Sequence, residues 1–176
     1  MMEIKIEPLT EEDANALYFF ECENRSFFEK MVPSRGEHYY QFDFFLERHR
    51  ELLLEQSKRT SYFYLIKDLS GMIVGRINLV DVDQVNGIAS IGYRIGESYT
   101  GRGIANQAVA ILLTLPGLEE IKEIRAVTTS HNIASQKILE RHYFKQTHVG
   151  DDVECNGETV TMLHFVWTRA SKGIQG

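Results

Sequence analysis

Two glycines stand one residue apart where a predicted strand gives way to a predicted helix. The segment from Thr100 to Asn106 reads TGRGIAN, with Gly101 and Gly103 on either side of Arg102. The first N–H groups of a helix lack intrahelical partners, and the helix dipole adds partial positive charge there. Glycines leave these groups open to close approach, which is typical of a phosphate or pyrophosphate site. A tight strand-to-helix turn explains two such glycines about as often.

Two better-known phosphate loops do not fit this segment, and a third motif does not fit the residues just before it. A Rossmann fingerprint needs a third glycine where this chain has Asn106, and a P-loop needs Gly-Lys followed by Ser or Thr. Gly96, Glu97 and Ser98 begin like a hydrolase nucleophile elbow, but Thr100 replaces the closing glycine. We therefore expect Ser98 to be an ordinary loop residue.

A second polar pair marks the start of a later helix. Asn132 and Ser135 lie three residues apart, so both belong to one face of the first helical turn. Ile138 and Leu139 give the same helix an apolar side that faces inward. Taken alone, Asn132 is more simply an N-cap and Ser135 a surface serine. Only together with the glycine segment does this pair indicate a site.

The hydrophobic pattern predicts the elements that would position these groups. Strands are expected at 3–9, 61–68, 72–82, 88–95, 122–129, 144–153 and 158–169. Helices are expected at 10–21, 40–56, 103–115 and 132–144. This order indicates an α/β fold with a mixed, mostly antiparallel sheet of about seven strands flanked by helices.

One pair of strands should differ from the others. The strand at 122–129 follows a helical crossover, so we expect it to run parallel to the strand that ends near Ile95. Ligands in such sheets bind beyond the carboxyl ends of the strands, where the glycine segment lies. The aromatic residues between 24 and 54 are expected in the core, whereas the loop at 31–38 is a candidate wall of the site.

Composition narrows the class of protein. The 176 residues are expected to form one domain at 1–170, followed by a disordered tail at 171–176. A net charge of −6 argues against direct nucleic-acid binding; it is compatible with an amine substrate without selecting one. No apolar run reaches the roughly 20 residues that cross a membrane, and the acidic N-terminus lacks a signal-peptide pattern. We expect a cytoplasmic protein with reduced cysteines and no metal site.

Together these segments resemble the GNAT acetyltransferases, most closely their RimJ/RimL-like branch. Residues 100–105 match the phosphate-loop pattern Q/R-x-x-G-x-G/A, and IGYRIG at 91–96 looks like the family's fourth strand. Residues 132–144 resemble its N-x-x-S…L-E-K-x-G-F segment. The resemblance spans almost the whole chain, with two departures. Thr100 replaces Gln or Arg, and Tyr143 replaces a glycine, which would strain the turn if the position needs a positive φ.

The resemblance implies a fold with a splay between the fourth and fifth strands, and acetyl-CoA as the acetyl donor. Its pyrophosphate would bind backbone N–H groups of the glycine segment, and its pantetheine would run between the splayed strands. The implied cofactor-binding residues are Ile95, Gly101, Arg102, Gly103, Ile104, Ala105, Asn106 and Asn132. An amine would attack the thioester directly, and Ser135 would protonate the departing CoA thiolate.

The general base is harder to predict. Many relatives carry a glutamate on the fourth strand, but residues 89–91 supply none. Glu97 follows that strand and is our candidate, acting directly or through water. Glu23, His38 and His131 rank below it. An acceptor whose amine has a lowered pKa, such as a peptide α-amino group, would need less help.

Several alternatives stay open at this point. The acceptor is a protein N-terminus, as in ribosomal-protein acetylation, or a small amine such as a polyamine or an antibiotic. A second hypothesis is a CoA-binding sensor or scaffold without turnover, which the missing strand glutamate favours and the pair Asn132 and Ser135 opposes. A third is a nucleotide- or phosphate-binding module. The long C-terminal strands are also compatible with a homodimer.

Overall fold

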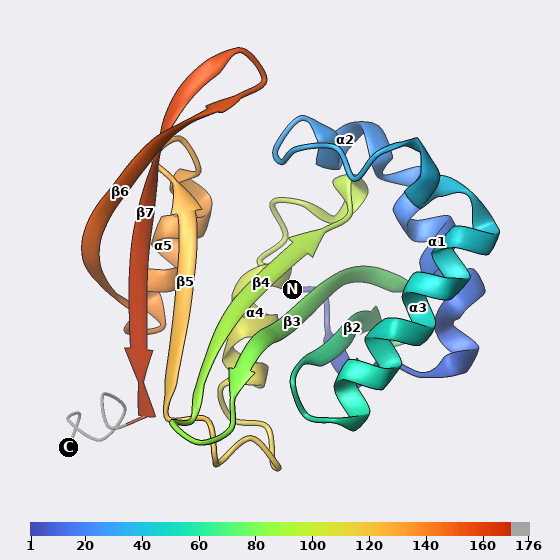
Figure 1. Ribbon diagram of the computed structural model, residues 1–176, viewed down its shortest axis with the longest axis horizontal. Helices are drawn as coiled ribbons and strands as arrows, with labels where there is room; N and C mark the ends of the chain where they lie inside the picture. Colours follow the sequence, from blue (N-terminus) through green and yellow to red (C-terminus); the bar gives the residue numbers. More distant parts are fainter. Residues whose placement is uncertain (170–176) are drawn as a thin grey trace.

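The computed structural model describes residues 1–169 and contains one seven-stranded sheet with helices packed against it (Figure 1). The strands are β1 (Ile4–Pro8), β2 (Tyr62–Asp68), β3 (Ile73–Asp83), β4 (Ile88–Ile95), β5 (Glu123–Thr129), β6 (Lys145–Cys155) and β7 (Glu158–Thr168). The helices are α1 (Ala14–Glu23), α2 (Arg25–Glu29), α3 (Phe42–Ser57), α4 (Ile104–Leu112) and α5 (Ile133–Arg141), with 3-10 turns η1 (Glu11–Asp13), η2 (Glu37–Tyr40) and η3 (Glu97–Tyr99). The tail expected at 171–176 lies outside the described residues.

The sheet has the order β1-β2-β3-β4-β5-β7-β6, and every neighbouring pair is antiparallel except β4 and β5. The predicted mixed sheet and its one parallel pair are therefore confirmed. β4 and β5 pair only through residues 88–90 and 123–125, although both strands continue beyond them. They diverge towards their carboxyl ends, so the expected splay is present (Figure 1).

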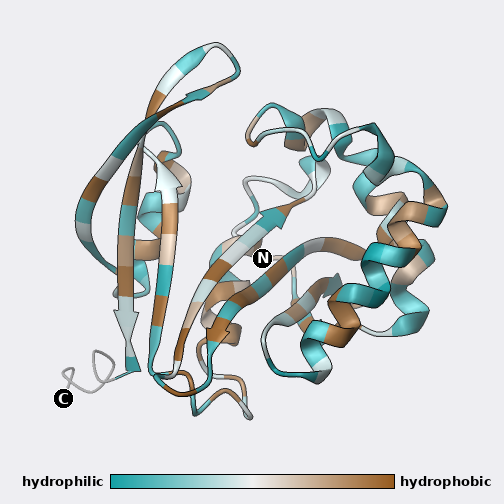
Figure 2. Cartoon of the chain, viewed as in Figure 1, coloured by the Kyte–Doolittle hydropathy of each residue, from teal (hydrophilic) through white to brown (hydrophobic). Residues whose placement is uncertain are grey.

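Alternation along the strands creates two separate apolar cores. Tyr64 and Ile66 of β2 belong to a cluster that includes α4 and α5 residues, whereas Phe63 and Leu65 belong to a cluster with α1, α2 and α3. Because neighbouring strand residues point to opposite faces, helices cover both sides of the sheet. Figure 2 shows the hydrophobic residues recurring along β3, β4 and β5 between these two layers.

Some helix boundaries differ from the predicted ones. α4 ends at Leu112 rather than near 115, and α5 ends at Arg141 rather than at 144. The second difference has a backbone cause, because Tyr143 has a φ of 67° and cannot continue a right-handed helix. The aromatic segment is divided among α2, η2 and α3, and its residues Phe28, Tyr39 and Phe45 are buried as expected. The expectation is wrong for Phe42 and Phe44, which are 39% and 46% exposed because they lie in the first turn of α3 off its buried face.

The two halves of the molecule meet across the open end of the splay. Asn156, at the turn between β6 and β7, donates from Nδ2 to the carbonyl of Lys30 just after α2 (Figure 1). β6 is an edge strand of the sheet, so it is free of a strand neighbour on one side within the described residues. Dimerisation through the C-terminal strands stays a prediction. Within residues 1–169, no helix is both long and apolar enough to cross a membrane.

Candidate active site

A cavity of about 700 Å³ opens where β4 and β5 separate. Residues 91–95 of β4 line one side and residues 126–129 of β5 the other. The N–H of Gly96 donates to the carbonyl of Val74 on β3, 2.9 Å away. Backbone polar groups alternate along a strand, so the N–H and C=O of Ile95 point to the opposite side, towards the splay. Ile95 therefore offers backbone hydrogen bonds to an extended ligand in the cavity.

The glycine segment forms one end of this cavity. Gly101 and Gly103 have φ angles of 72° and 73°, in the left-handed region that favours glycine. A Cβ built on either would meet no atom within 4 Å, so the space in front of them is open. Gly103 is the N-cap of α4 and provides no side chain to its first N–H groups. These donors fit a diphosphate group.

The carboxyl end of α5 is tied to the same segment. Nε2 of His142 donates to Oδ1 and to the carbonyl of Asn106, at 2.9 and 3.1 Å. Burial lowers the pKa of His142, so its ring is neutral at physiological pH. Tyr143 follows with its positive φ, so the position where the family pattern has glycine does require the left-handed conformation.

The start of α5 brings two hydroxyl groups together. Oδ1 of Asn132 accepts from the N–H of Ser135 at 3.1 Å, so Asn132 is an N-cap and also lines the cavity. Oγ of Ser135 lies 3.0 Å from Oη of Tyr93 on β4. Burial raises the pKa of Tyr93, and its hydrogen bond with Ser135 only partly opposes this. Both hydroxyls therefore stay protonated at neutral pH.

The other end of the cavity has a mostly apolar wall with one arginine. Phe27, Phe28, Met31, Val32 and Arg35 line it, so three of its residues come from the loop expected as a wall of the site. Met31 and Val32 are 49% and 42% exposed. They are therefore accessible to an incoming molecule.

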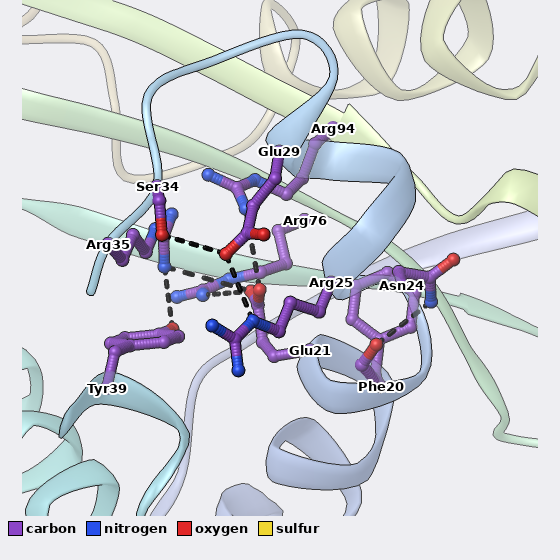
Figure 3. Close-up of polar contacts among 10 residues, drawn as sticks. All are labelled: Phe20, Glu21, Asn24, Arg25, Glu29, Ser34, Arg35, Tyr39, Arg76 and Arg94. Carbon is purple, nitrogen blue, oxygen red and sulfur yellow. Dashed lines mark hydrogen bonds and ion pairs between the residues drawn. The ribbon is translucent and has the colours of Figure 1, made fainter. Parts of the chain in front are cut away.

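An ionic cluster whose arginines also line the cavity adjoins this wall and includes its Arg35 (Figure 3). Glu21 of α1 is fully buried, with Oε1 2.6 Å from Nη1 of Arg76 and Oε2 3.4 Å from Nη1 of Arg94. Nη1 of Arg35 lies 4.0 Å from the same carboxylate. Burial alone would raise the pKa of Glu21, but the three arginines outweigh it and the pKa is lowered. The carboxylate of Glu21 is therefore ionised at neutral pH.

The comparisons with known proteins agree with this geometry. Residues 3–145 match the family model described as "Acetyltransferase (GNAT) domain". The chain belongs to the GNAT acetyltransferase family.

Relatives of this GNAT enzyme are distant in sequence and similar in fold. The chain is 27% identical over 164 residues to "Probable N-acetyltransferase YjcK" of Bacillus subtilis, which covers 88% of this chain and 87% of that protein. Its structure matches ribosomal-protein-S5-alanine acetyltransferase from Vibrio fischeri at 16% identity with a TM-score of 0.86, covering 96% and 94% of the two chains. It matches Mycobacterium smegmatis RimJ in complex with CoA-disulfide at 21% identity with a TM-score of 0.84, covering 98% and 84%.

GNAT enzymes use acetyl-CoA as the acetyl donor. Most of the residues expected to bind it meet on one cavity, namely Ile95, Gly101, Gly103, Ile104, Ala105, Asn106 and Asn132, together with Ser135. Arg102 is not among the lining residues, and its guanidinium lies over the ring of Tyr99, 5.7 Å from its centroid. The roles of all these residues stay predictions.

The expected general base does not reach the cavity. Glu97 is exposed on η3, and its backbone N–H donates to Oδ1 of Asn24 at 2.8 Å. Glu23, His38 and His131 do not line the cavity either, and within residues 1–169 no carboxylate or imidazole does. The geometry of this GNAT site therefore gives Glu97 no support as the base.

Sequence reasoning missed Tyr93, Arg76 and Arg94. Arg76 and Arg94 interrupt apolar strands, and that anomaly is the signal that could have identified them, because charged side chains are rarely buried without a partner. Tyr93 lies two residues from both Ile91 and Ile95. In a strand this spacing places all three side chains on the same face of the sheet.

Proposed function

We propose that this GNAT enzyme transfers the acetyl group of acetyl-CoA to a primary amine, by direct attack and without an acyl-enzyme. The acceptor is a protein N-terminal α-amino group or a small amine. One observation carries the proposal: the glycine segment at the start of α4 and the hydroxyl pair of Tyr93 and Ser135 open on the same cavity, between two strands whose backbone groups are free to pair.

The donor would be held mainly by backbone groups. The N–H groups of Ile104, Ala105 and Asn106 lie at the positive end of α4, where an anion is stabilised. The backbone of Ile95 would hydrogen-bond an extended chain in the splay. Acetyl-CoA supplies an acyl carbon activated as a thioester and a thiolate leaving group. A backbone N–H of β4 would stabilise charge that develops on the carbonyl oxygen.

The hydroxyl pair would manage the leaving group. As the C–N bond forms and the C–S bond breaks, Oγ of Ser135 would donate a proton to the departing sulfur. Oη of Tyr93, 3.0 Å away, would return a proton to Ser135. Burial raises the pKa of Tyr93, so its hydroxyl is protonated before the reaction, and solvent would return the proton that Tyr93 gives to Ser135.

The lining also favours one kind of amine. The attacking nitrogen must be neutral, yet no carboxylate or imidazole among residues 1–169 lines the cavity to deprotonate it. A peptide α-amino group has a pKa of about 7.7–8.0, against about 10.4 for a lysine side chain. An α-amino group is therefore the better acceptor, with water removing its proton.

The test is the release of CoA thiol from acetyl-CoA with a panel of amines. We expect Ser135→Ala to lower kcat by about 100-fold with an unchanged KM for acetyl-CoA, and Tyr93→Phe to have a smaller effect on kcat. Ser98→Ala is the matched control, because Ser98 is an exposed serine of η3 outside the cavity lining. Full activity of Ser135→Ala would contradict the proposed role of its hydroxyl.

A CoA-binding sensor without turnover is the second candidate. The specific observation that favours it is the same lack of a carboxylate or imidazole in the described lining. Binding of acetyl-CoA without thiol release from any amine would support the sensor. Amine-dependent thiol release would exclude it.

A further inference from the structure

The charged residues that line the cavity all have one sign. They are Arg35, Arg76, Arg94, Lys137 and Arg141, and no Asp or Glu within residues 1–169 accompanies them. This contrasts with the net charge of −6 on the whole chain. Lys137 and Arg141 lie on α5, at the end where the donor would bind. The three other arginines converge on the side of the sheet covered by α1 and α2, and their charge needs a separate explanation.

Glu21 does not neutralise these three arginines. One carboxylate faces three guanidinium groups, which leaves these four residues with two positive charges, and the neighbouring Glu29 is paired with Arg25 (Figure 3). Glu21 and Arg76 lie at its base, with side chains 0% and 6% exposed, whereas those of Arg94 and Arg35 are 22% and 34% exposed. The surplus charge therefore lies towards the cavity.

The cluster also has hydrogen-bonding capacity that the described chain does not use. Nε of Arg76 and Oδ1 of Asn78 are buried and have no hydrogen-bond partner among residues 1–169, although both residues line the cavity. Buried polar atoms in native proteins nearly always have a partner. Arg76 is only 5% exposed, so an unpaired donor on it is costly. Of these two atoms only Nε of Arg76 is a donor that suits an anion, because Oδ1 of Asn78 is an acceptor.

Aromatic rings hold the two outer arginines in place. The guanidinium of Arg94 lies 4.7 Å from the ring centroid of Phe28, and that of Arg35 lies 4.8 Å from the centroid of Tyr39. Nη1 of Arg35 also donates to Oη of Tyr39 at 2.6 Å. Stacked guanidinium planes lose less conformational freedom when they bind a ligand. Burial and the neighbouring arginines lower the pKa of Arg94, as expected where positive charge is in excess.

We propose that Arg35, Arg76 and Arg94 form an anion subsite for the acceptor, so that the acceptor carries a carboxylate or phosphoryl group near its reacting amine. This inference rests on the proposed function and specifies its substrate class. Guanidinium groups match both anions in bidentate geometry. Two unbalanced positive charges would repel a polyamine, whose other amines are protonated.

The test uses pairs of acceptors that differ in one anionic group. Glycylglycine is compared with glycylglycinamide, and phosphoethanolamine with ethanolamine, by thiol release from acetyl-CoA. We expect the anionic member of at least one pair to have a kcat/KM about tenfold higher or more, because charge-assisted bidentate contacts are strong. The pair that shows the preference tells carboxylate from phosphoryl. Equal kcat/KM values within both pairs would overturn the inference and leave the acetyltransferase proposal intact.

Variants connect the preference to the cluster. We expect Arg94→Gln and Arg35→Gln each to reduce the preference towards unity with an unchanged KM for acetyl-CoA. Arg35→Gln guards against misfolding, because Arg35 is partly exposed and lies 4.0 Å from Glu21. Arg48→Gln is the matched control, since Arg48 pairs with Glu51 and Glu55 on α3 and does not line the cavity. A preference that survives both cluster variants would contradict the inference.

A binding measurement separates this inference from the proposed function. N-acetylglycylglycine and its amide are titrated by calorimetry into the protein saturated with CoA, and N-acetylphosphoethanolamine and N-acetylethanolamine likewise. Measuring the binding of these ligands requires no turnover by the enzyme. Tighter binding of an anionic product, lost in Arg94→Gln, would support the subsite even if no amine were acetylated. Equal binding within both pairs would count against it whatever the activity.

Discussion

The two ends of the cavity, which we propose bind the acetyl donor and the acceptor, offer different kinds of binding group. The donor end presents backbone N–H groups of α4 and two neutral hydroxyls, and its shape depends on Gly101 and Gly103. The acceptor end presents guanidinium side chains around Glu21. Backbone donors carry no titratable charge and change only when the chain changes shape. The arginines depend on a carboxylate that can be protonated or removed, so the acceptor end should be the more fragile of the two.

The largest effect is expected from Glu21→Gln, which removes the negative charge from the arginine cluster. Three guanidinium groups would then face one another with no carboxylate between them. Breaking a buried ion pair in this way costs about 3–5 kcal/mol in the free energy of unfolding. Urea unfolding of the variant and the wild-type protein measures the loss.

Glu47→Gln is the matched control for that substitution. Glu47 is an exposed residue of α3 in the same half of the molecule, so its replacement should change the free energy of unfolding by about 0.5 kcal/mol or less. If Glu21→Gln were no more destabilising than Glu47→Gln, the cluster would not depend on its carboxylate. The proposed contrast between the two ends would then fail.

The next largest effect concerns the donor end. Gly103→Asp would place a carboxylate in the open space before the first N–H groups of α4. We expect the affinity for acetyl-CoA to fall by about 100-fold, or about 2.7 kcal/mol, as measured by calorimetric titration. Part of any loss of stability would come from the positive φ of 73°.

Gly117→Asp separates strain from charge in this experiment. Gly117 also has a positive φ, 89°, with nothing within 4 Å of an added Cβ, and it does not line the cavity. Both variants should lose similar stability, but only Gly103→Asp should lose affinity for acetyl-CoA. Equal affinities in the two variants would mean that the glycine segment is only a turn.

The contrast between the two ends of the cavity also explains which parts of the fold and the site the sequence predicts. The donor end is local: residues 101–106 are contiguous, and Asn132 and Ser135 share one helical turn. Glycine spacing, helix capping and strand alternation act over a few residues, so these parts and the mixed sheet were predictable. Tyr143 was singled out for the same local reason, and its φ is positive.

The acceptor end depends on contacts that no local rule supplies. Glu21 and Arg94 are 73 positions apart in the sequence. They meet because α1 packs on the face of the sheet that carries Arg76 of β3 and Arg94 of β4. One local signal was present: Leu17 and Glu21 are four residues apart on α1, and both are fully buried. Sequence analysis did not use that signal, and it would not have named the partners of Glu21, because tertiary packing selects them.

A pH series on the carboxylate of Glu21 should produce a smaller change in the free energy of unfolding. The pKa of Glu21 is lowered below its ordinary value of 4.5, so its ionised form stabilises the fold above that value. This stabilisation is lost as the pH falls through the lowered pKa. The stability gap between wild type and Glu21→Gln should be constant near neutral pH and should narrow below about 4.5, by up to about 1.4 kcal/mol per pH unit. Urea unfolding between pH 3 and 7 measures the gap, and a constant gap would show that Glu21 keeps an ordinary pKa.

The smallest expected effect concerns Asn132, where a capping role and a binding role coincide. Oδ1 of Asn132 caps α5 through the N–H of Ser135, so Asn132→Ala should cost about 1 kcal/mol in the free energy of unfolding. Asn132→Ser keeps a capping oxygen but loses the amide donor that would bind the pantetheine arm. It should therefore keep nearly wild-type stability, while its affinity for acetyl-CoA falls about fivefold, as expected for one lost hydrogen bond. Unfolding and calorimetric titration of the same two variants measure both quantities. If Asn132→Ser kept full affinity, Asn132 would be a cap alone, and the donor end would bind through backbone groups to an even greater degree.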